Sequence, residues 1–197
     1  MAISLIKGQN TSLSNGLSQI LVGLGWDPRQ DAGDEFDLDA SCFLLGENGK
    51  VRSQRDLIFY KQGYDRSVCG SVVYGGDNRN GVGDGDDETF DINLSTIPAD
   101  VAKLVFVVTI YKANERKQKF GMVDSAFIRV VNQTNNEEIV RFNLQDDARD
   151  EKAVIFGELY RKEGAWKFRA LGQAFDSGDP NCRHELQALA KNYGMKF

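Results

Sequence analysis

The 197-residue chain is poor in the residues on which many enzyme classes depend. It has three cysteines (Cys42, Cys69 and Cys182) and one histidine, His184. An odd number of cysteines without a Cys-x-x-Cys pair is typical of reduced thiols in the cytoplasm rather than of a disulfide framework. The histidine is far in sequence from every acidic cluster, so we expect it to be structural or to lie on the surface. The sequence therefore gives no Ser-His-Asp or Cys-His arrangement for nucleophilic catalysis.

The chain also lacks segments that would bring it to a membrane or to nucleic acid. The longest apolar run, 104–110, is too short to cross a bilayer. The N-terminus has no secretory apolar region, and Ala2 stands where myristoylation requires glycine. A net charge of −5 argues against nucleic acid as a partner, because phosphate binding needs a basic face. We expect a soluble cytoplasmic protein that is not itself a membrane protein.

The negative charge is concentrated in two short segments. Residues 27–39 and 75–88 together hold eleven acidic and two basic residues, a net charge of −9, while the rest of the chain has a net charge of +4. Acidic residues that served only solubility would be spread over the surface. The concentration points to a specific role for both segments, although a solvated acidic loop remains the alternative for each of them.

The second acidic segment has the composition of a cation-binding loop. Residues 75–88 read Gly-Gly-Asp-Asn-Arg-Asn-Gly-Val-Gly-Asp-Gly-Asp-Asp-Glu. The glycines let the backbone turn so that carboxylates converge. Two carboxylates about 5 Å apart repel by roughly 3 kcal/mol at an effective dielectric near 20, so convergence is costly unless a cation lies between them. Calcium accepts about 6–8 oxygen ligands in a flexible loop and suits this composition.

Two better-known loop motifs do not fit this segment. Residues 77–88 have the length of an EF-hand loop, but Arg79, Gly81 and Val82 occupy positions where that motif needs oxygen ligands and then a glycine. Extended segments rather than helices flank the loop. A phosphate-binding loop is excluded as well, because Gly-Lys-Ser/Thr is absent and the acidic residues would repel phosphate.

The first acidic segment ends in a strand with alternating character. Residues 36–45 read Phe-Asp-Leu-Asp-Ala-Ser-Cys-Phe-Leu-Leu. With a period of two, Asp37 and Asp39 share one face and Cys42 lies on the apolar face. The strand thus fixes two carboxylates side by side, and the thiol of Cys42 is expected to be buried.

The remaining patterns predict an all-β protein, an antiparallel β-sandwich of two packed sheets with a C-terminal α-helix, in a single domain over residues 1–197. An N-cap at Asp179, a proline at 180 and Gly194 at the C-terminal cap delimit the helix. Its apolar stripe comprises Leu186, Leu189, Ala190 and Tyr193. The basic segment 113–121 is expected to be a solvated connection, or else a partner-binding surface. Strands are expected at 5–6, 17–26, 36–45, 57–61, 67–74, 89–94, 103–111, 126–131, 138–144, 153–160 and 166–171.

Several motifs together resemble the TerD family of tellurium-resistance and general stress proteins. The acidic motif is Gly76-Asp-Asn-x-x-Gly-x-Gly-Asp-Gly-Asp-Asp-Glu, preceded by Phe36-Asp-Leu-Asp-Ala-Ser. The similarity continues in Tyr111-Lys-Ala-Asn-Glu-Arg-x-Gln-x-Phe-Gly, Ile128-Arg-Val and Ile155-Phe-Gly-Glu-Leu-Tyr-Arg, and so covers nearly the whole chain.

The resemblance implies calcium binding at one end of a β-sandwich, commonly at two adjacent sites. It also implies partners among other tellurite-resistance and stress proteins, in a membrane-associated stress complex. The residues that it places around the ions are Asp37, Asp39, Asp77, Asn78, Asp84, Asp86, Asp87 and Glu88. Two Ca²⁺ ions would offset four of the nine excess negative charges of the two segments.

We therefore expect a non-enzymatic, calcium-binding stress-response protein associated with tellurite resistance, acting as an ion-dependent binding or scaffold module. The alternative is a metal-dependent phosphohydrolase or transferase that uses the same acidic cluster to hold Mg²⁺ and a substrate phosphate. Reduction of tellurite by cysteine thiols is a third possibility, but the spacing of the cysteines offers no paired thiol.

Overall fold

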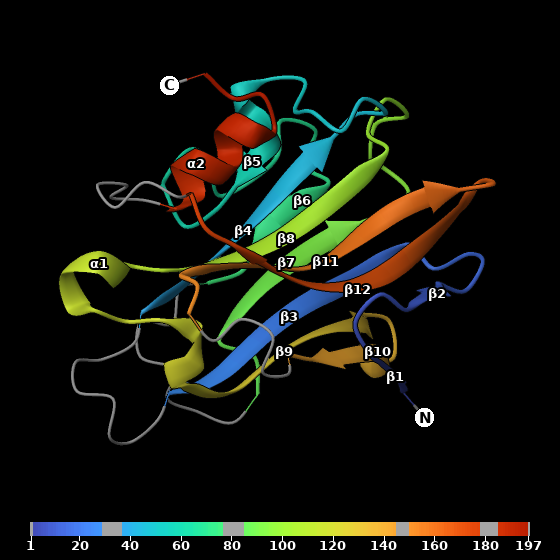
Figure 1. The fold of residues 1–197 in the computed structure, drawn as a ribbon. Helices are drawn as coiled ribbons and strands as arrows, with labels where there is room; N and C mark the ends of the chain where they lie inside the picture. Colours follow the sequence, from blue (N-terminus) through green and yellow to red (C-terminus); the bar gives the residue numbers. More distant parts are fainter. Residues whose placement is uncertain (1, 29–36, 77–84, 145–149, 178–184, 197) are drawn as a thin grey trace.

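The computed structural model describes residues 2–28, 37–76, 85–144, 150–177 and 185–196. Within these ranges the chain forms two six-stranded sheets that pack face to face, with few helices (Figure 1). The all-β sandwich with a C-terminal helix is thereby confirmed. No helix of the described ranges combines the length and apolar character that a membrane crossing requires.

The first sheet, sheet A, has the strand order β1-β10-β9-β3-β7-β6. Five of its strands follow the expected antiparallel pattern, but β1 pairs with β10 in parallel. The parallel pairing departs from the prediction, and no turn-like sequence signal could have indicated it, because β1 and β10 lie far apart in the chain. The strands are β1 (Ile3–Leu5), β3 (Gln19–Pro28), β6 (Val72–Tyr74), β7 (Glu88–Asn93), β9 (Val123–Asn132) and β10 (Glu137–Asn143).

The second sheet, sheet B, has the order β2-β12-β11-β8-β4-β5 and is antiparallel throughout. Its apolar strand β8 lies in the interior of the sheet, as the continuous apolar run predicts. The strands are β2 (Asn10–Ser12), β4 (Leu38–Leu45), β5 (Leu57–Ile58), β8 (Lys103–Ile110), β11 (Ala153–Lys162) and β12 (Ala165–Phe175).

The main core lies between the two sheets and follows from alternation along the strands. Ile20, Val22 and Leu24 of β3 are at most 1% exposed and face it. Phe106 of β8 and Phe168 of β12 enter the same core from sheet B. The predicted strand is confirmed, and since side chains alternate along it, Gly23 and Gly25 lie on the outer face of sheet A.

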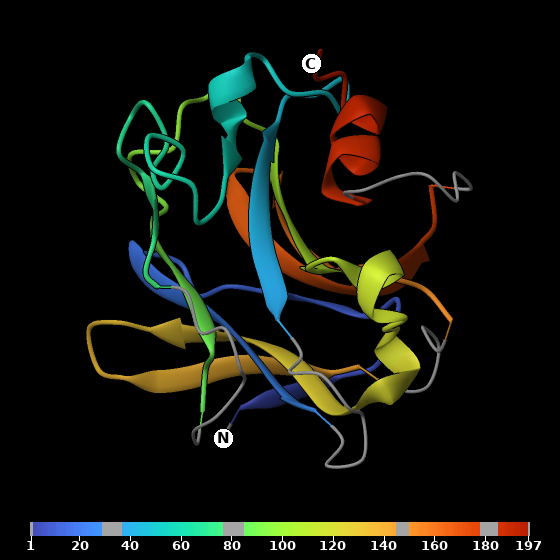
Figure 2. The same cartoon turned by 90° about the vertical axis from the view of Figure 1, so that its left-hand side faces the viewer.

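Strand β4 differs from its prediction, because both of its faces are buried. Leu38, Ala40 and Cys42 lie in the main core as expected. The opposite face, expected to be polar, is covered by helix α2 (Glu185–Asn192), and Phe43 belongs to a second apolar cluster beneath it. Figure 2 shows α2 on the side of sheet B that faces away from sheet A.

Three short helical segments were not predicted. The 3₁₀ turns are η1 (Gln54–Asp56) and η2 (Phe120–Met122), and α1 (Ala113–Arg116) forms a single α-helical turn. Lys112 and Lys117 flank α1 in the left-handed backbone region, at φ 52° and 54°. Lysine gives no sequence signal for such a turn, since this region favours glycine and asparagine.

The apolar stripe predicted for the C-terminal helix is confirmed where the structure describes it. Leu189 and Ala190 are at most 1% exposed, and Leu186 and Tyr193 pack against the same cluster. Gly194 follows the helix with φ at +88°, the conformation of a C-terminal cap. The predicted start at Asp179 and Pro180, together with His184, lies outside the described residues.

The docking of α2 is tested by Leu189→Ala. Removing this buried side chain should lower the free energy of unfolding by roughly 2–5 kcal/mol, because a cavity remains beneath the helix. Urea denaturation measures the change. Val68→Ala is the control, since Val68 is 78% exposed and its truncation should change stability by less than about 0.5 kcal/mol. Equal stability of the two variants would contradict the docked position of α2.

Candidate metal-binding site

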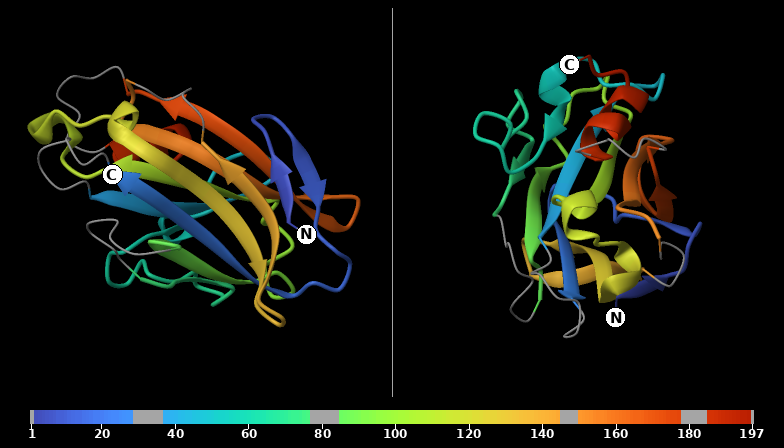
Figure 3. Two further views of the ribbon diagram at one scale, coloured as in Figure 1. Left: turned by 90° about the horizontal axis from the view of Figure 1, so that it is seen from below. Right: turned by 60° about the vertical axis from the view of Figure 1, so that its left-hand side comes forward.

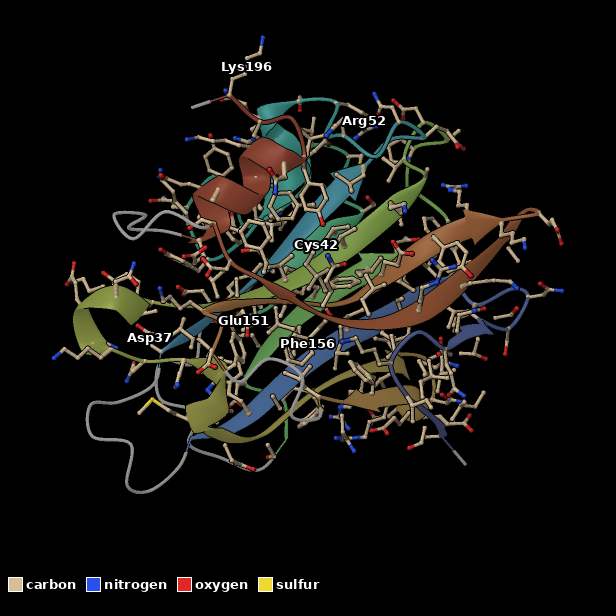
Figure 4. The ribbon with its side chains drawn as sticks, in the orientation of Figure 1. Asp37, Cys42, Arg52, Glu151, Phe156 and Lys196 are labelled. Carbon is tan, nitrogen blue, oxygen red and sulfur yellow. The ribbon has the colours of Figure 1, made fainter. Side chains whose placement is uncertain are left out.

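The described flanks of both acidic segments lie at one end of the sandwich, which we call the loop end. Strand pairing brings the end of β3 next to the start of β7 and of β9 in sheet A. In sheet B, the start of β4 pairs with the end of β8 and lies at the same end, near α1 (Figure 1). Asp37 marks this end in Figure 4. Carboxylates from two distant parts of the sequence are thus carried to one region.

Glu88 links the two sheets at the loop end. Its side chain is inside the sandwich, and the residue is only 1% exposed. Its Oε2 accepts a hydrogen bond from the backbone N–H of Ala40 at 2.6 Å. Glu88 begins β7 of sheet A and Ala40 belongs to β4 of sheet B. Glu88 of the second acidic segment therefore contacts β4, at the residue that follows Asp39.

Asp87 is held against the end of β3. Its backbone N–H donates to the carbonyl of Leu24 at 2.8 Å, and its Oδ2 accepts from the backbone N–H of Trp26 at 2.8 Å. The side chain thus takes the place that a backbone carbonyl would occupy if β7 continued along β3. This capping fixes the direction in which the acidic loop leaves sheet A.

Asp86 points to the outer face of sheet A, where Arg129 of β9 binds both of its oxygens. Arg129 Nε donates to Oδ1 at 2.8 Å and Nη2 donates to Oδ2 at 2.9 Å. The carboxylate lies over Gly23, because a Cβ at that position would come within 2.2 Å of its Cγ. Figure 3 (left) shows β3 and β9 side by side on this face. The Asp86 side chain is 9% exposed, so the pair is largely shielded from water.

The Arg129 pair extends into a small network on the same face. Arg129 Nη1 contacts Glu138 of β10 at 3.1 Å, and Glu138 also accepts from Arg141 Nε at 3.1 Å. Hydrogen bonding to Asp86 raises the pKa of Arg129. Partial burial opposes ionisation of Glu138, but hydrogen bonds from Arg141 and Arg129 outweigh it and lower the pKa of this carboxyl. Four charges are therefore held together, and Asp86 is the member that belongs to the acidic loop.

Asp37 immediately precedes β4, and Asp39 is its second residue. The carbonyl of Asp37 accepts from the N–H of Tyr111 at 2.8 Å, which continues the β4–β8 ladder. Asp39 is 9% exposed and lies opposite Thr109 of β8 on the outer face of sheet B. Glu88, by contrast, reaches the same strand from within the sandwich.

The predicted ligand set is thus described only in part. Asp77, Asn78 and Asp84 lie outside the described residues. Asp37, Asp39, Asp86, Asp87 and Glu88 stand at the loop end with oxygen atoms that suit calcium, and both oxygens of Asp86 accept hydrogen bonds from Arg129. Within the described ranges, no three acidic, histidine or cysteine side chains are close enough together to hold a metal ion.

The contributions of Arg129 and Gly23 did not emerge from the sequence. Alternation along β9 could have placed Arg129 on the outer face, because Ile128 and Val130 are apolar. Its pairing with Asp86, 43 residues away, had no such signal. Gly23 interrupts an apolar strand, which is a recognised sign of close approach by another group.

The cysteines differ in accessibility. Cys42 is fully buried, as expected from its place on the apolar face of β4. This burial raises the pKa of its thiol well above the ordinary value. Cys69 is exposed. Partial burial raises its pKa, but hydrogen bonds with Ser67 and Ser71 outweigh this effect and lower the pKa. Cys182 lies outside the described residues.

Comparisons with known proteins agree on one family for this chain. The TerD domain matches residues 1–193 of the chain. The tellurium resistance protein TerD of Alcaligenes sp is 54% identical over 198 residues, which cover 99% of this chain and 98% of that protein. General stress protein 16U of Bacillus subtilis (strain 168) is 47% identical over 200 residues, covering 100% of this chain and 99% of that protein.

A solved structure supports the fold. The crystal structure of a homologue of telluride resistance protein (TerD) from Streptomyces coelicolor A3(2) superposes with a TM-score of 0.66. It covers 82% of this chain and 92% of its own, at 22% sequence identity. This likeness shows that the two chains share the same sandwich.

The Asp86–Arg129 pair is tested by a double-mutant cycle with Asp86→Asn and Arg129→Gln. Each single change should destabilise the protein in chelator, and the double variant should lose less than the sum, with a coupling energy of about 0.5–3 kcal/mol. Chemical denaturation measures the free energy of unfolding of the unmodified protein, the two single variants and the double variant. Lys119→Gln is the control, because the Lys119–Asp150 pair is exposed and should contribute at most about 1 kcal/mol. Simple additivity would show that the pair does not anchor the loop.

Thiol alkylation tests the difference in accessibility between Cys69 and Cys42. Iodoacetamide should modify Cys69 in the native protein, with a rate that rises with pH and reaches half its maximum below the pKa of an ordinary cysteine, because the thiolate is the reacting species. Cys42 should react only after denaturation. Peptide mass spectrometry across a pH series assigns each site. Modification of Cys42 at a rate similar to that of Cys69 in the folded protein would contradict its burial.

Proposed function

The chain belongs to the TerD family of tellurium-resistance and general stress proteins, and on this premise we propose that it is a calcium-binding stress-response protein of the cytoplasm. It acts without catalysis, as a binding module whose surface depends on the bound ion. Its partners in this proposal are other tellurite-resistance and stress proteins, gathered in a membrane-associated complex.

One observation supports the proposal above the others, namely the burial of Glu88 within an acidic region. Its carboxyl group lies between the sheets, beside the backbone that carries Asp39 and next in sequence to Asp87. Withdrawing a carboxylate from water costs several kcal/mol, and neighbouring carboxylates add repulsion. A divalent cation bound among them would offset both costs.

The remaining acidic residues would complete the site. The ligands that we propose are Asp37, Asp39, Asp77, Asn78, Asp84, Asp87 and Glu88. Asp86 was expected among them, but Arg129 already occupies both of its oxygens. We therefore give Asp86 the role of a positioning residue, which holds the C-terminal limb of the acidic loop against β3 while its neighbours face the ion.

When bound, calcium supplies positive charge that neutralises the mutual repulsion of the carboxylates. The chain itself supplies the geometry. Asp87 is aligned by Trp26, and Glu88 by Ala40, so these two carboxyl groups are fixed before the ion arrives. Binding would tie the segment before β4 to the segment before β7, and thereby both sheets to each other. Stability would then rise with free calcium, by about 2.7 kcal/mol at a concentration 100 times the dissociation constant.

Calcium titration tests the proposal directly. Calcium should raise the melting temperature of the protein and a chelator should lower it, while isothermal calorimetry should give up to two ions per chain. Asp84→Asn combined with Asp87→Asn should remove most of the calcium-dependent shift, because two oxygen ligands lose their charge. Glu47→Gln combined with Glu163→Gln is the matched control, since both residues are exposed and lie outside the acidic segments.

Two outcomes would contradict this function. The first is a melting temperature that does not respond to calcium, or that responds equally in the double variant. The second is phosphate release from nucleotides or phosphoesters that depends on Asp84, which would favour the metal-dependent hydrolase. A colorimetric phosphate assay with the same variants distinguishes the hydrolase from the binding module.

A further inference from the structure

A second possible site lies on the outer face of sheet B, beneath α2. A cavity of about 470 Å³ opens there between β4, β8, the segment 57–64 and the start of α2. This volume falls within the range of about 300–1,000 Å³ that is usual for small-molecule sites. The cavity is separate from the Arg129 network, which lies on the outer face of the other sheet.

The acidic residues of the cavity lie deep within it. Asp39 is 9% exposed and Glu185 is 6% exposed, and both line the cavity with Thr109. Glu185 accepts hydrogen bonds from the backbone N–H and hydroxyl of Ser177 at 3.1 and 3.2 Å, which fix its orientation. Each carboxylate oxygen can accept more than one hydrogen bond, so the capacity to meet a donor from a ligand remains.

The walls of the cavity are aromatic. Phe59, Tyr60, Tyr64 and Tyr111 are among the residues that line it. Phe59 packs edge-on against Tyr60, with ring centroids 5.4 Å apart, and against Tyr64 at 5.6 Å. These contacts hold the rings in place. Tyr60 is nevertheless 44% exposed, so it stands at the mouth and leaves a large apolar surface open.

The charges are arranged so that the interior is negative. Of the described residues that line the cavity, the cationic ones are Lys61 and Lys196, and both are exposed. Lys196 extends away from the body of the molecule (Figure 4), and Lys61 Nζ lies 5.7 Å from the centre of the Tyr64 ring. Cationic side chains lie over two of the rings, Arg55 and Lys61 near Tyr64 and Lys112 and Arg116 near Tyr111. The negative charge of the cavity comes from the two buried carboxylates, which attract a positive group and disfavour an anion.

We propose that this cavity binds a small organic amine, with its ammonium group between Asp39 and Glu185 and its apolar body against the aromatic wall. A primary ammonium group fits better than a quaternary one, because two carboxylates and the Thr109 hydroxyl offer hydrogen-bond acceptors, and a quaternary group has no N–H to donate to them. Asp39 is also one of the proposed calcium ligands, so an ion and an amine would share this carboxylate, and the amine is tested in the absence of calcium.

A matched series of probes tests the charge preference. Phenethylamine, 2-phenylethanol and phenylacetate carry the same ring with a cationic, a neutral and an anionic end. Ligand-observed saturation-transfer NMR, with titrations in calcium-free buffer that contains a chelator, should show the amine binding at least about tenfold more tightly than the alcohol, and no binding of the carboxylate. Equal binding of amine and alcohol, or binding of none of the three, would overturn the proposal.

Two variants locate the site. Glu185→Gln should weaken binding of the amine about tenfold or more, because it removes a charge that the ammonium group contacts while retaining the shape of the side chain. Tyr60→Ala should weaken it as well, and its exposed position leaves folding intact. Glu163→Gln, on the β11–β12 turn far from the cavity, should bind phenethylamine as the unmodified chain does. Unchanged amine affinity in both Glu185→Gln and Tyr60→Ala would place the binding elsewhere and reject this site.

Discussion

A hydrogen bond at the loop end joins the two sheets, from the backbone N–H of Ala40 to the carboxylate of Glu88. Within the part of the chain that the structure describes, β5 pairs with Cys42 and Phe43 of β4, and no strand pairs with the outer edge of β4 near residues 38–41. A strand edge of this kind presents unpaired backbone groups. Glu88 satisfies one of them from the opposite sheet. The chain thus uses an acidic side chain where a sandwich would ordinarily use another strand or a loop backbone.

Three consecutive residues hold the end of the second acidic segment, and each makes a different contact. Asp86 is bound on the outer face of sheet A, Asp87 caps the backbone of β3, and Glu88 enters the interior. Gly85, with φ at +114°, precedes them in a conformation that other residues rarely adopt. Gly23 provides the space for the Asp86 carboxylate. The three acidic residues of the run Gly-Asp-Asp-Glu therefore anchor the chain in three different directions.

Much of the fold could be predicted from the sequence, because alternation and apolar content determine which faces are buried. The inward face of β3, the interior position of β8 and the stripe of α2 all follow from such local patterns. The second buried face of β4 did not, since the helix that covers it lies about 140 residues later. Local patterns carry no information about which distant element covers a face.

The candidate site was predictable in its chemistry and less so in its geometry. Clustered acids indicated an oxygen-rich region, and strand pairing does bring the flanks of both segments to one end. The sequence could not show that Arg129 would bind Asp86, because a charge pair between segments 43 residues apart produces no periodic pattern in the sequence. Nor could it show that Asp39 would line a cavity under α2.

The N-terminal residues have a consequence for the sandwich as a whole. Strand β1 borders sheet A and β2 borders sheet B, and only four residues, 6–9, separate them. One short stretch of backbone therefore shields the open margins of both sheets along the same flank. Detachment of this stretch would expose β10 and β12 together. Two edge strands with unpaired backbone groups would then become available for intermolecular pairing in a single event.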